Sequence, residues 1–485
     1  GVGQLTRRPS AAEEMTSPVD MMVEVLEKAG ADAGAPSLPR LAQSVQVVDV
    51  INWRYENPAR MLAEALGADP VETVSSTVGG NTPQMLVNDA SRRIQAGELD
   101  LVIIAGAEAG MSRRLARSQG LSLDWPARPH EGTAADRVVG STDFPSHEAE
   151  MERGIAIPTQ LYPIFENAIR HAEGRDPNAH LGVIGTLWSR FSRVAAHNPH
   201  AWQPAPTSAQ DIVTPSEGNR MVAYPYTKLL CANLTVDQAA AIIVCSAEAA
   251  ELAGVPRDRW VFPVAGADAN DHWFVSERDE LHSSPGIRLC GQRVFGLAGV
   301  GPADLEHVDL YSCFTSAVEV AAKELGFGLF ERDLTVTGGL TFGGGPGNNY
   351  VTHSIATVAE RLRADSGRTH ALVTANGWYL TKHSLGIYSN EPPPEGYRWE
   401  SPQAGVDSLP RREVVRDHDG EITVESFTVV HERDGTPGTG FVACRLDDGR
   451  RAWGATRDPD EMKALEETDL IGTRALLSDG TVVLG

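Results

Sequence analysis

Two glycine-rich stretches of the sequence could bring bare main chain against a ligand. The first is Gly79-Gly80, followed by Asn81, and the second is the run GGGPG at 343–347. Because glycine has no Cβ, main-chain N–H groups there can approach a substrate closely and stabilise a developing oxyanion. The alternative is that these glycines serve only tight turns and close packing between two halves of the protein.

The five cysteines are scattered along the chain, at Cys231, Cys245, Cys290, Cys313 and Cys444. They contain no Cys-x-x-Cys pair and no even framework, so we expect neither structural disulfides nor a zinc site. We predict no metal and no resident cofactor.

The segments around these residues alternate between strand and helix patterns. The spacing predicts a helix over 18–30, a buried strand over 45–53, a helix over about 84–96 and an apolar strand over 99–111. The alternation resumes at Asp237 and continues to Ser384. This order is typical of sheets covered by helices, in two α/β halves.

With 485 residues the chain exceeds one hydrophobic core, so several units are expected. We predict a first α/β half at 1–120, continued at about 223–255, and an inserted loop domain at 121–222. A second half follows at 256–392. The proline-rich stretch after Pro392 is expected to be a linker, and short alternating strands at 405–485 predict a small all-β barrel or sandwich.

The net charge of −23 argues against nucleic-acid binding, which needs clustered Lys and Arg. No apolar run approaches the roughly 18 residues of a membrane span, and no signal-peptide pattern opens the chain. These observations predict a cytoplasmic protein.

Four segments, in chain order, resemble the catalytic loops of the thiolase superfamily. The segment 73–108 resembles the family's nucleophile region, and the family's cysteine falls on Gly80. The Asn or His of the second loop falls on Tyr311, the His of the Gly-His-Pro loop on Gly345, and the cysteine of the Cys-x-Gly loop on Ala375. Four loops in family order are a much more specific signal than one glycine-rich turn.

This resemblance covers residues 1–390 and is greatest to the sterol-carrier-protein branch of the superfamily. It implies a duplicated five-layered αβαβα thiolase fold with a loop-domain insertion. The opening GVGQ suggests that the family's first strand is missing or cropped. The tail resembles the OB-fold domain of actinobacterial thiolase-like proteins, through ITVESFTVVH at 422–431 and LDDG at 446–449. We therefore expect a C-terminal OB-like barrel, packed on the body.

The resemblance also implies a site for CoA or acyl-CoA. Its predicted substrate pocket contains Gly80, Asn81, Ser312, Cys313, Gly344, Gly345, Asn376 and Gly377. Tyr311 and His383 are the candidate acid/base residues. The alternatives are a packed tyrosine with its hydroxyl satisfied, and a structural histidine. His353, on a predicted helix, fits a core or interface position.

Three functions follow from these residues. The first is an acyl-CoA-binding protein of the acyltransferase (acetyl-CoA acetyltransferase) family that is inactive as a thiolase, because a thiolase needs a thiolate, an acid/base cysteine and a histidine. The second is a retro-aldol lyase acting on a β-hydroxyacyl-CoA through Tyr311. Related aldol lyases carry a Tyr-Asp-Cys-Phe loop, and Ser312 departs from it. The third is a non-catalytic scaffold that docks a partner through the OB-like domain. The chain is expected to be a monomer or a homodimer.

Overall fold

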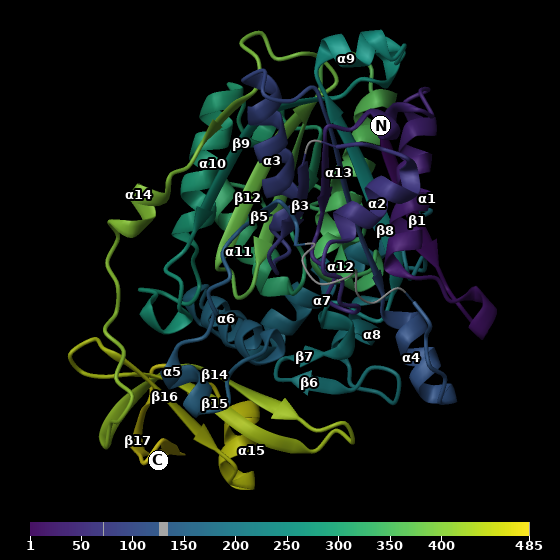
Figure 1. Ribbon diagram of the computed structural model, residues 1–485. Helices are drawn as coiled ribbons and strands as arrows, with labels where there is room; N and C mark the ends of the chain where they lie inside the picture. The colour runs from purple at the N-terminus through teal and green to yellow at the C-terminus, as the bar shows by residue number, and fades with distance from the viewer. Residues whose placement is uncertain (71, 126–133, 485) are drawn as a thin grey trace.

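Two mixed β-sheets, each with helices on both faces, form the body of the protein in the computed structural model (Figure 1). The structure describes residues 1–70, 72–125 and 134–484. Helices α3 (Thr82–Gln95) and α13 (Tyr350–Ala364) lie between the two sheets and contact strands of both. With helices on the outer faces, this gives the predicted five layers, αβαβα, and the two predicted halves.

The first sheet has the order β1-β8-β4-β2-β3-β5. Its strands are Val2–Arg7 (β1), Ser44–Val47 (β2), Glu72–Ser76 (β3), Leu101–Ala109 (β4), Arg137–Val139 (β5) and Asp237–Cys245 (β8). Along β4 the side chains alternate: Ile103 and Ala105 pack with the outer helices α1 (Pro18–Asp32) and α2 (Pro58–Leu66), whereas Val102 and Ile104 join the inner core. Because successive side chains of a strand point to opposite faces, β4 contributes residues to both the outer and the inner core.

The second sheet has the order β10-β11-β12-β9-β13. Its strands are Phe262–Asn270 (β9), His307–Asp309 (β10), His370–Gly377 (β11), Lys382–Ser389 (β12) and Arg398–Glu400 (β13). Helix α10 (Pro285–Ala298) packs on β9 and β12, with α11 (Thr315–Leu325) beside it. Every residue of β11 and β12 is buried, as expected for a sheet covered on both faces.

The inserted region between the halves is mostly helical. It contains α4 (Gly110–Gln119), α5 (Glu148–Glu152), α6 (Pro158–Ala172), α7 (Pro177–Ala196), α8 (Ala209–Val213), β6 (Met221–Ala223) and β7 (Tyr226–Thr227). Elsewhere lie α9 (Ala247–Leu252), α12 (Gly339–Phe342), α14 (Gln403–Asp407) and α15 (Pro459–Glu467). Short 3-10 turns occur at Ala12–Glu14, Leu38–Leu41, Lys228–Leu230, Arg257–Arg259, Val275–Glu277, Pro302–Asp304 and Gly347–Asn349. No helix in the described part of the chain is both long enough and apolar enough to cross a membrane.

The C-terminal strands close into a barrel, as predicted. They are Gly420–His431 (β14), Pro437–Arg445 (β15), Arg451–Thr456 (β16), Arg474–Ser478 (β17) and Thr481–Leu484 (β18). Pairing runs β14-β15-β16-β18-β17 and returns to β14. The barrel encloses its own apolar core, which includes Val424, Val442 and Leu477.

The barrel docks on the inserted region through main-chain groups, so the prediction of a packed tail is confirmed. Val430 of β14 pairs with Ala223 of β6, which extends the barrel sheet into the body. The Ser426 hydroxyl donates to the Ile164 carbonyl over 2.6 Å, and the Asn167 amide donates to the Phe427 carbonyl over 2.9 Å. In Figure 1 the yellow barrel lies beneath α6, at the end of the molecule farthest from α9.

Three local expectations were wrong. A strand does open the first sheet, because Val2–Arg7 pair with β8. The strand expected over 45–53 ends at Val47, since the amides of Ile51 and Asn52 donate to the buried Glu108 carboxylate and leave the ladder. The expected linker contains β13, which pairs with β9.

Arg451 is the side chain that joins the barrel to the body most directly. It is fully buried, and its guanidinium donates to the carbonyls of Ser276 and Arg278 at 2.9 and 2.5 Å and to the Glu425 carboxylate at 2.6 Å. The substitution Arg451→Met leaves these acceptors unpaired, so we expect it to lower the free energy of unfolding by about 3–5 kcal/mol.

Urea unfolding together with limited proteolysis of the barrel measures this effect. The matched control is Arg450→Met, because the Arg450 side chain is 38% exposed and pairs with the exposed carboxylates of Asp448 and Glu413, which predicts a loss below about 1 kcal/mol. Equal unfolding midpoints for the two variants would contradict the docking role of Arg451.

Candidate functional site

The four loops predicted from the sequence meet between the two sheets. The Gly79 amide donates to the Asn348 side-chain oxygen over 2.8 Å, which joins the first loop to the third. The second loop supplies Tyr311, and its ring reaches Gly80. The fourth loop supplies the Asn376 carbonyl, which also borders Gly80.

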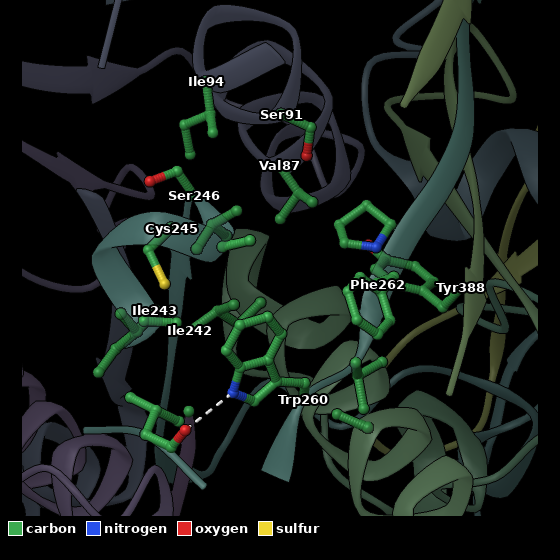
Figure 2. A pocket seen from close by; sticks show the side chains of 18 of the residues that line it. Val87, Ser91, Ile94, Ile242, Ile243, Cys245, Ser246, Trp260, Phe262 and Tyr388 are labelled. Atoms are coloured by element: carbon green, nitrogen blue, oxygen red, sulfur yellow. Dashed lines mark hydrogen bonds between the residues drawn. The ribbon is translucent and has the colours of Figure 1, made fainter. Parts of the chain in front are cut away.

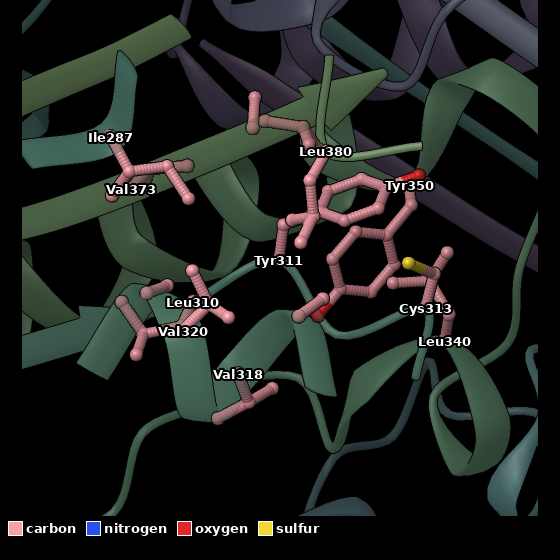
Figure 3. Packing of buried hydrophobic residues seen from close by; sticks show 14 of the residues in the cluster. Ile287, Leu310, Tyr311, Cys313, Val318, Val320, Leu340, Tyr350, Val373 and Leu380 are labelled. Atoms are coloured by element: carbon pink, nitrogen blue, oxygen red, sulfur yellow. The ribbon is translucent and has the colours of Figure 1, made fainter. Parts of the chain in front are cut away.

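The Tyr311 side chain fills the space that a side chain at position 80 would need. A Cβ on Gly80 would lie 2.1 Å from the Tyr311 hydroxyl oxygen and 2.7 Å from the Asn376 carbonyl oxygen. The Tyr311 amide donates to Thr374 Oγ1 over 2.9 Å, and its ring packs edge-on against Tyr350, with centroids 5.7 Å apart (Figure 3). Glycine at 80 and tyrosine at 311 are therefore sterically matched.

The Tyr311 hydroxyl makes no hydrogen bond to any residue that the structure describes, although the residue is only 8% exposed. Burial raises the pKa of Tyr311 well above its usual value. The phenol is therefore neutral at physiological pH and can donate a proton, but it is a poor base.

Cys313 lies in the same core, beside Tyr311 and Leu340 (Figure 3). Burial raises the pKa of its thiol to about 12. A neutral thiol is a weak nucleophile. Ser312 is fully buried, and its hydroxyl lies against Gly339.

Lys382 is a polar residue of this site that the sequence analysis missed. Its amine donates to the Val78 carbonyl over 2.5 Å and would lie 2.8 Å from a Cβ on Gly79. Burial lowers the pKa of Lys382 to about 8. The signal available in the sequence was a lysine at the start of the strand-like segment 382–389, a few residues after the fourth loop.

Asn81 and Asn376 each present a buried amide oxygen to the site. Neither Oδ1 atom has a hydrogen-bond partner among the described residues. The Asn376 amide nitrogen donates to the Tyr162 hydroxyl over 2.8 Å, which fixes that side chain. Asn81 Oδ1 lies close to both Gly79 and Gly377, so these predicted residues do share one corner.

The amides of Gly80 and Asn81 have no acceptor within the described ranges, whereas the Thr82 amide donates to the Gly79 carbonyl. They stand at the start of α3, where unpaired N–H groups and the helix dipole favour a negative oxygen. This end of the helix could hold a thioester oxygen or an enolate.

Gly344 and Gly345 have other neighbours. The Gly345 amide donates to the Asn233 carbonyl over 3.0 Å, and a Cβ on Gly344 would meet the Gln238 side chain at 2.1 Å. Gly344 also has a φ of 110°, a conformation that favours glycine. The Gly345 amide is thus already engaged, and both glycines serve close packing here.

The two histidines lie in separate networks. His383 Nε2 lies 2.9 Å from Asp271 and 3.2 Å from the Ser284 hydroxyl, at the start of α10. His353 contacts Gln4 through Nδ1, and burial lowers its pKa to about 3, so its imidazole is neutral. Neither histidine contacts Gly80 or Tyr311 within the described hydrogen-bond network.

The space left between Tyr311, Ala375 and His383 is a cavity of about 10 Å³. That volume corresponds to about one water molecule. This cavity is therefore too small for an acyl group, and its lining does not include Gly79, Gly80 or Lys382.

The group of possible metal ligands within the described residues is Glu166, His180 and Glu319, all of which are buried. A Glu166 carboxylate oxygen lies 2.5 Å from His180 Nε2, within hydrogen-bond distance. The other carboxylate oxygen accepts a hydrogen bond from the Tyr226 hydroxyl. Burial, together with the Glu166 carboxylate, raises the pKa of Glu319, so a proton occupies this cluster. The network ties α6, α7 and α11 together.

Both the C-terminal barrel and the whole chain are similar to known proteins. Residues 402–481 match the family described as thiolase-like protein type 1 additional C-terminal domain. The crystal structure of a monomeric SCP2-thiolase like protein type 1 from Mycobacterium smegmatis is similar over 100% of this chain and 98% of that one, with 32% identity and a TM-score of 0.85.

Two curated relatives show what related sequences do. The 17-hydroxy-3-oxo-4-pregnene-20-carboxyl-CoA lyase of Mycobacterium tuberculosis is 31% identical over 327 residues, which is 61% of this chain and 76% of the lyase. An acetyl-CoA acetyltransferase of Methanocaldococcus jannaschii is 24% identical over 276 residues, 56% of this chain and 61% of that protein. The chain spans 61–65% of the length of three curated relatives, one of which is that acetyltransferase. The chain belongs to the thiolase-like family, which confirms the family predicted from the sequence.

The contact between Gly80 and Tyr311 predicts a specific loss of stability. Gly80 does not have a positive φ, so steric crowding is the penalty for a side chain there. We expect Gly80→Ala to lower the free energy of unfolding by about 1–3 kcal/mol, as other overpacked cores do.

Chemical unfolding in a double-mutant cycle checks this origin. The cost of Gly80→Ala should shrink when Tyr311 is replaced by leucine, because the crowded atoms are gone. The control is Gly182→Ala, a helical position where an added Cβ meets nothing within 4 Å. Strict additivity between positions 80 and 311 would contradict the steric match.

Proposed function

We propose that this protein binds CoA or an acyl-CoA thioester and does not form an acyl-enzyme. The observation that carries the proposal is the Tyr311 hydroxyl in the space of the missing nucleophile at position 80. Gly345 and Ala375 stand at the other two reactive positions and have no side chain that transfers a proton. Relatives named acetyl-CoA acetyltransferase and carboxyl-CoA lyase support a CoA thioester as the ligand.

In this proposal the start of α3 holds the thioester. Its carbonyl oxygen accepts from the unpaired amides of Gly80 and Asn81, and the Lys382 ammonium adds positive charge on the same side. Because the Tyr311 ring fills the space beside Gly80, binding there requires the ring to move, and the apparent affinity is lower when only a small fraction of molecules has the ring displaced.

Calorimetric titration of the full chain with CoA and acetoacetyl-CoA tests the proposal, with thiolysis followed in the same samples. We expect saturable binding and no thiolysis above the uncatalysed rate. Gly80→Cys alone should remain inactive, because the acid/base cysteine and the histidine are still missing.

The variant Asn81→Asp places a carboxylate beside the thioester oxygen, and we expect it to weaken acetoacetyl-CoA binding at least about tenfold. Asn178→Asp, an exposed position in the first turn of α7, is the matched control and should bind unchanged. Absence of saturation would refute binding, and thiolysis at the rate of a working thiolase would refute the loss of that chemistry.

A second candidate is retro-aldol cleavage of a β-hydroxyacyl-CoA, favoured by the juxtaposition of Tyr311 and Lys382 around Gly79 and Gly80. The relatives named steroid side-chain-cleaving aldolase and carboxyl-CoA lyase support it. Since burial lowers the pKa of Lys382 to about 8, part of its amine is neutral near physiological pH and can act as a base, whereas the raised pKa of Tyr311 keeps the phenol protonated.

In this reaction neutral Lys382 takes the proton of the β-hydroxyl. The Cα–Cβ bond then breaks, the β-carbon becomes a ketone or aldehyde, and the electron pair moves into the thioester enolate. Tyr311 gives a proton to the α-carbon, which yields a shortened acyl-CoA. The proton held by the Lys382 ammonium then passes through water to the Tyr311 phenolate, which restores both groups.

Product analysis with a branched β-hydroxyacyl-CoA tests the lyase. We expect a carbonyl product and an acyl-CoA in equal amounts, at a rate that rises with pH through about 8 as Lys382 loses its proton. Tyr311→Phe should lower the rate about 10²–10⁴-fold. The control variant Tyr55→Phe changes a tyrosine outside the site and should leave the rate unchanged. Recovery of intact substrate refutes lyase activity, and full activity in Tyr311→Phe refutes the role of that tyrosine.

A further inference from the structure

The Tyr162 hydroxyl joins the inserted region to the fourth loop of the site. It donates to the Trp378 carbonyl over 2.7 Å and accepts from the Leu380 amide over 3.2 Å. Trp378 and Leu380 have positive φ values of 59° and 54°, which are uncommon for residues other than glycine. Tyr162 therefore holds a strained turn in place.

The same hydroxyl decides which way the Asn376 side chain points. A tyrosine hydroxyl has one proton, and the Trp378 carbonyl accepts it, so Asn376 can face the hydroxyl only with a donor. The Asn376 amide nitrogen does so over 2.8 Å, and it also lies 4.0 Å from Cys313 Sγ. The Asn376 side-chain oxygen is left buried, without a partner among the described residues.

Packing fixes the Tyr162 ring independently of any ligand. The ring stacks on Phe314 of the second loop, with centroids 4.4 Å apart and 18° between the ring planes. Helix α6, which carries Tyr162, is bound to the barrel through the Ile164 carbonyl and the Asn167 amide. The orientation of Asn376 is thus set before a ligand arrives.

The start of α3 and the fourth loop offer a ligand opposite polarities. The unpaired amides of Gly80 and Asn81 are donors, whereas the Asn376 oxygen is an acceptor. Farther along α3, Val87 and Ser91 line a separate pocket (Figure 2). A thioester oxygen matches the donors, but the acceptor needs a ligand group that carries a hydrogen.

We propose that Tyr162 is a positioning residue that makes the site selective for acyl-CoA thioesters with a hydroxyl group on the acyl chain. Displacement of the Tyr311 ring, which binding requires, enlarges the small cavity that Asn376 lines. The ligand hydroxyl then donates to the Asn376 oxygen. A 3-oxo group would set a second acceptor against that oxygen, which is unfavourable in a buried site. This selectivity rests on the proposed function, because it requires an acyl-CoA in the four-loop site.

Three thioesters of equal chain length test the selectivity: 3-hydroxybutyryl-CoA, acetoacetyl-CoA and butyryl-CoA. Calorimetric titration of the full chain at about pH 6 measures binding without cleavage, because Lys382, with a pKa lowered by burial to about 8, is protonated there. We expect 3-hydroxybutyryl-CoA to bind about three- to tenfold more tightly than either of the other two.

The variant Tyr162→Phe releases Asn376, whose amide nitrogen can then turn toward the ligand. The preference for 3-hydroxybutyryl-CoA over acetoacetyl-CoA should therefore disappear. The matched control is Tyr379→Phe, which removes the bond from the Tyr379 hydroxyl to the Ala156 carbonyl at the same turn, 2.6 Å long, and should keep the preference. Thermal melting of both variants separates a loss of stability from a loss of selectivity.

Asn376→Ala should also abolish the preference with Tyr162 intact, which tests the acceptor even where Tyr162→Phe does not fold. Equal affinities of the natural chain for 3-hydroxybutyryl-CoA and acetoacetyl-CoA overturn the selectivity and leave the proposed binding standing. A preference that persists in folded Tyr162→Phe overturns the positioning role, and one that persists in Asn376→Ala overturns the contact. Failure of all three thioesters to saturate refutes the proposed function, and this selectivity with it.

Discussion

The rest of the four-loop site depends on the close contact between the Tyr311 ring and Gly80. While the ring is in place, a Cβ at position 80 would lie 2.1 Å from its hydroxyl, so no side chain fits. Restoring a nucleophile at this position therefore means removing the tyrosine as well. The glycine at position 80 and the tyrosine at position 311 are therefore sterically linked.

The surrounding loops hold this arrangement rigidly from both halves. Asn348 accepts from the Gly79 amide and donates to the Asp49 carbonyl, which ties the third loop to the first half. Glu108 fixes the segment after β2 through the amides of Ile51 and Asn52, and burial raises its pKa to about 7. With these contacts satisfied internally, what remains open to a ligand is the start of α3, the Asn81 and Asn376 oxygens, and the Lys382 amine.

Much of the architecture was predictable because it is encoded locally. The continuous apolar run of β4 and the helical spacing of α1 and α3 identify the layers, and alternation after residue 420 identifies the barrel. The meeting of Gly80 with Tyr311 followed only from the resemblance of the loops. Contacts between distant segments were not predictable, because no local pattern records them. Examples are Lys382 beside Gly79, and β6 against β14. The engaged amide of Gly345 shows the same limit, since a glycine run looks alike whether it faces a ligand or packs against Asn233.

The most direct test of this account is the intact mass of the protein after incubation with acetyl-CoA and an acid quench. The account predicts the mass of the unmodified chain and recovery of the thioester, because no reactive side chain stands at position 80 and the Cys313 thiol, with a pKa raised to about 12 by burial, remains neutral. A stoichiometric acetyl adduct that forms on the folded protein and is absent from the denatured one would contradict it.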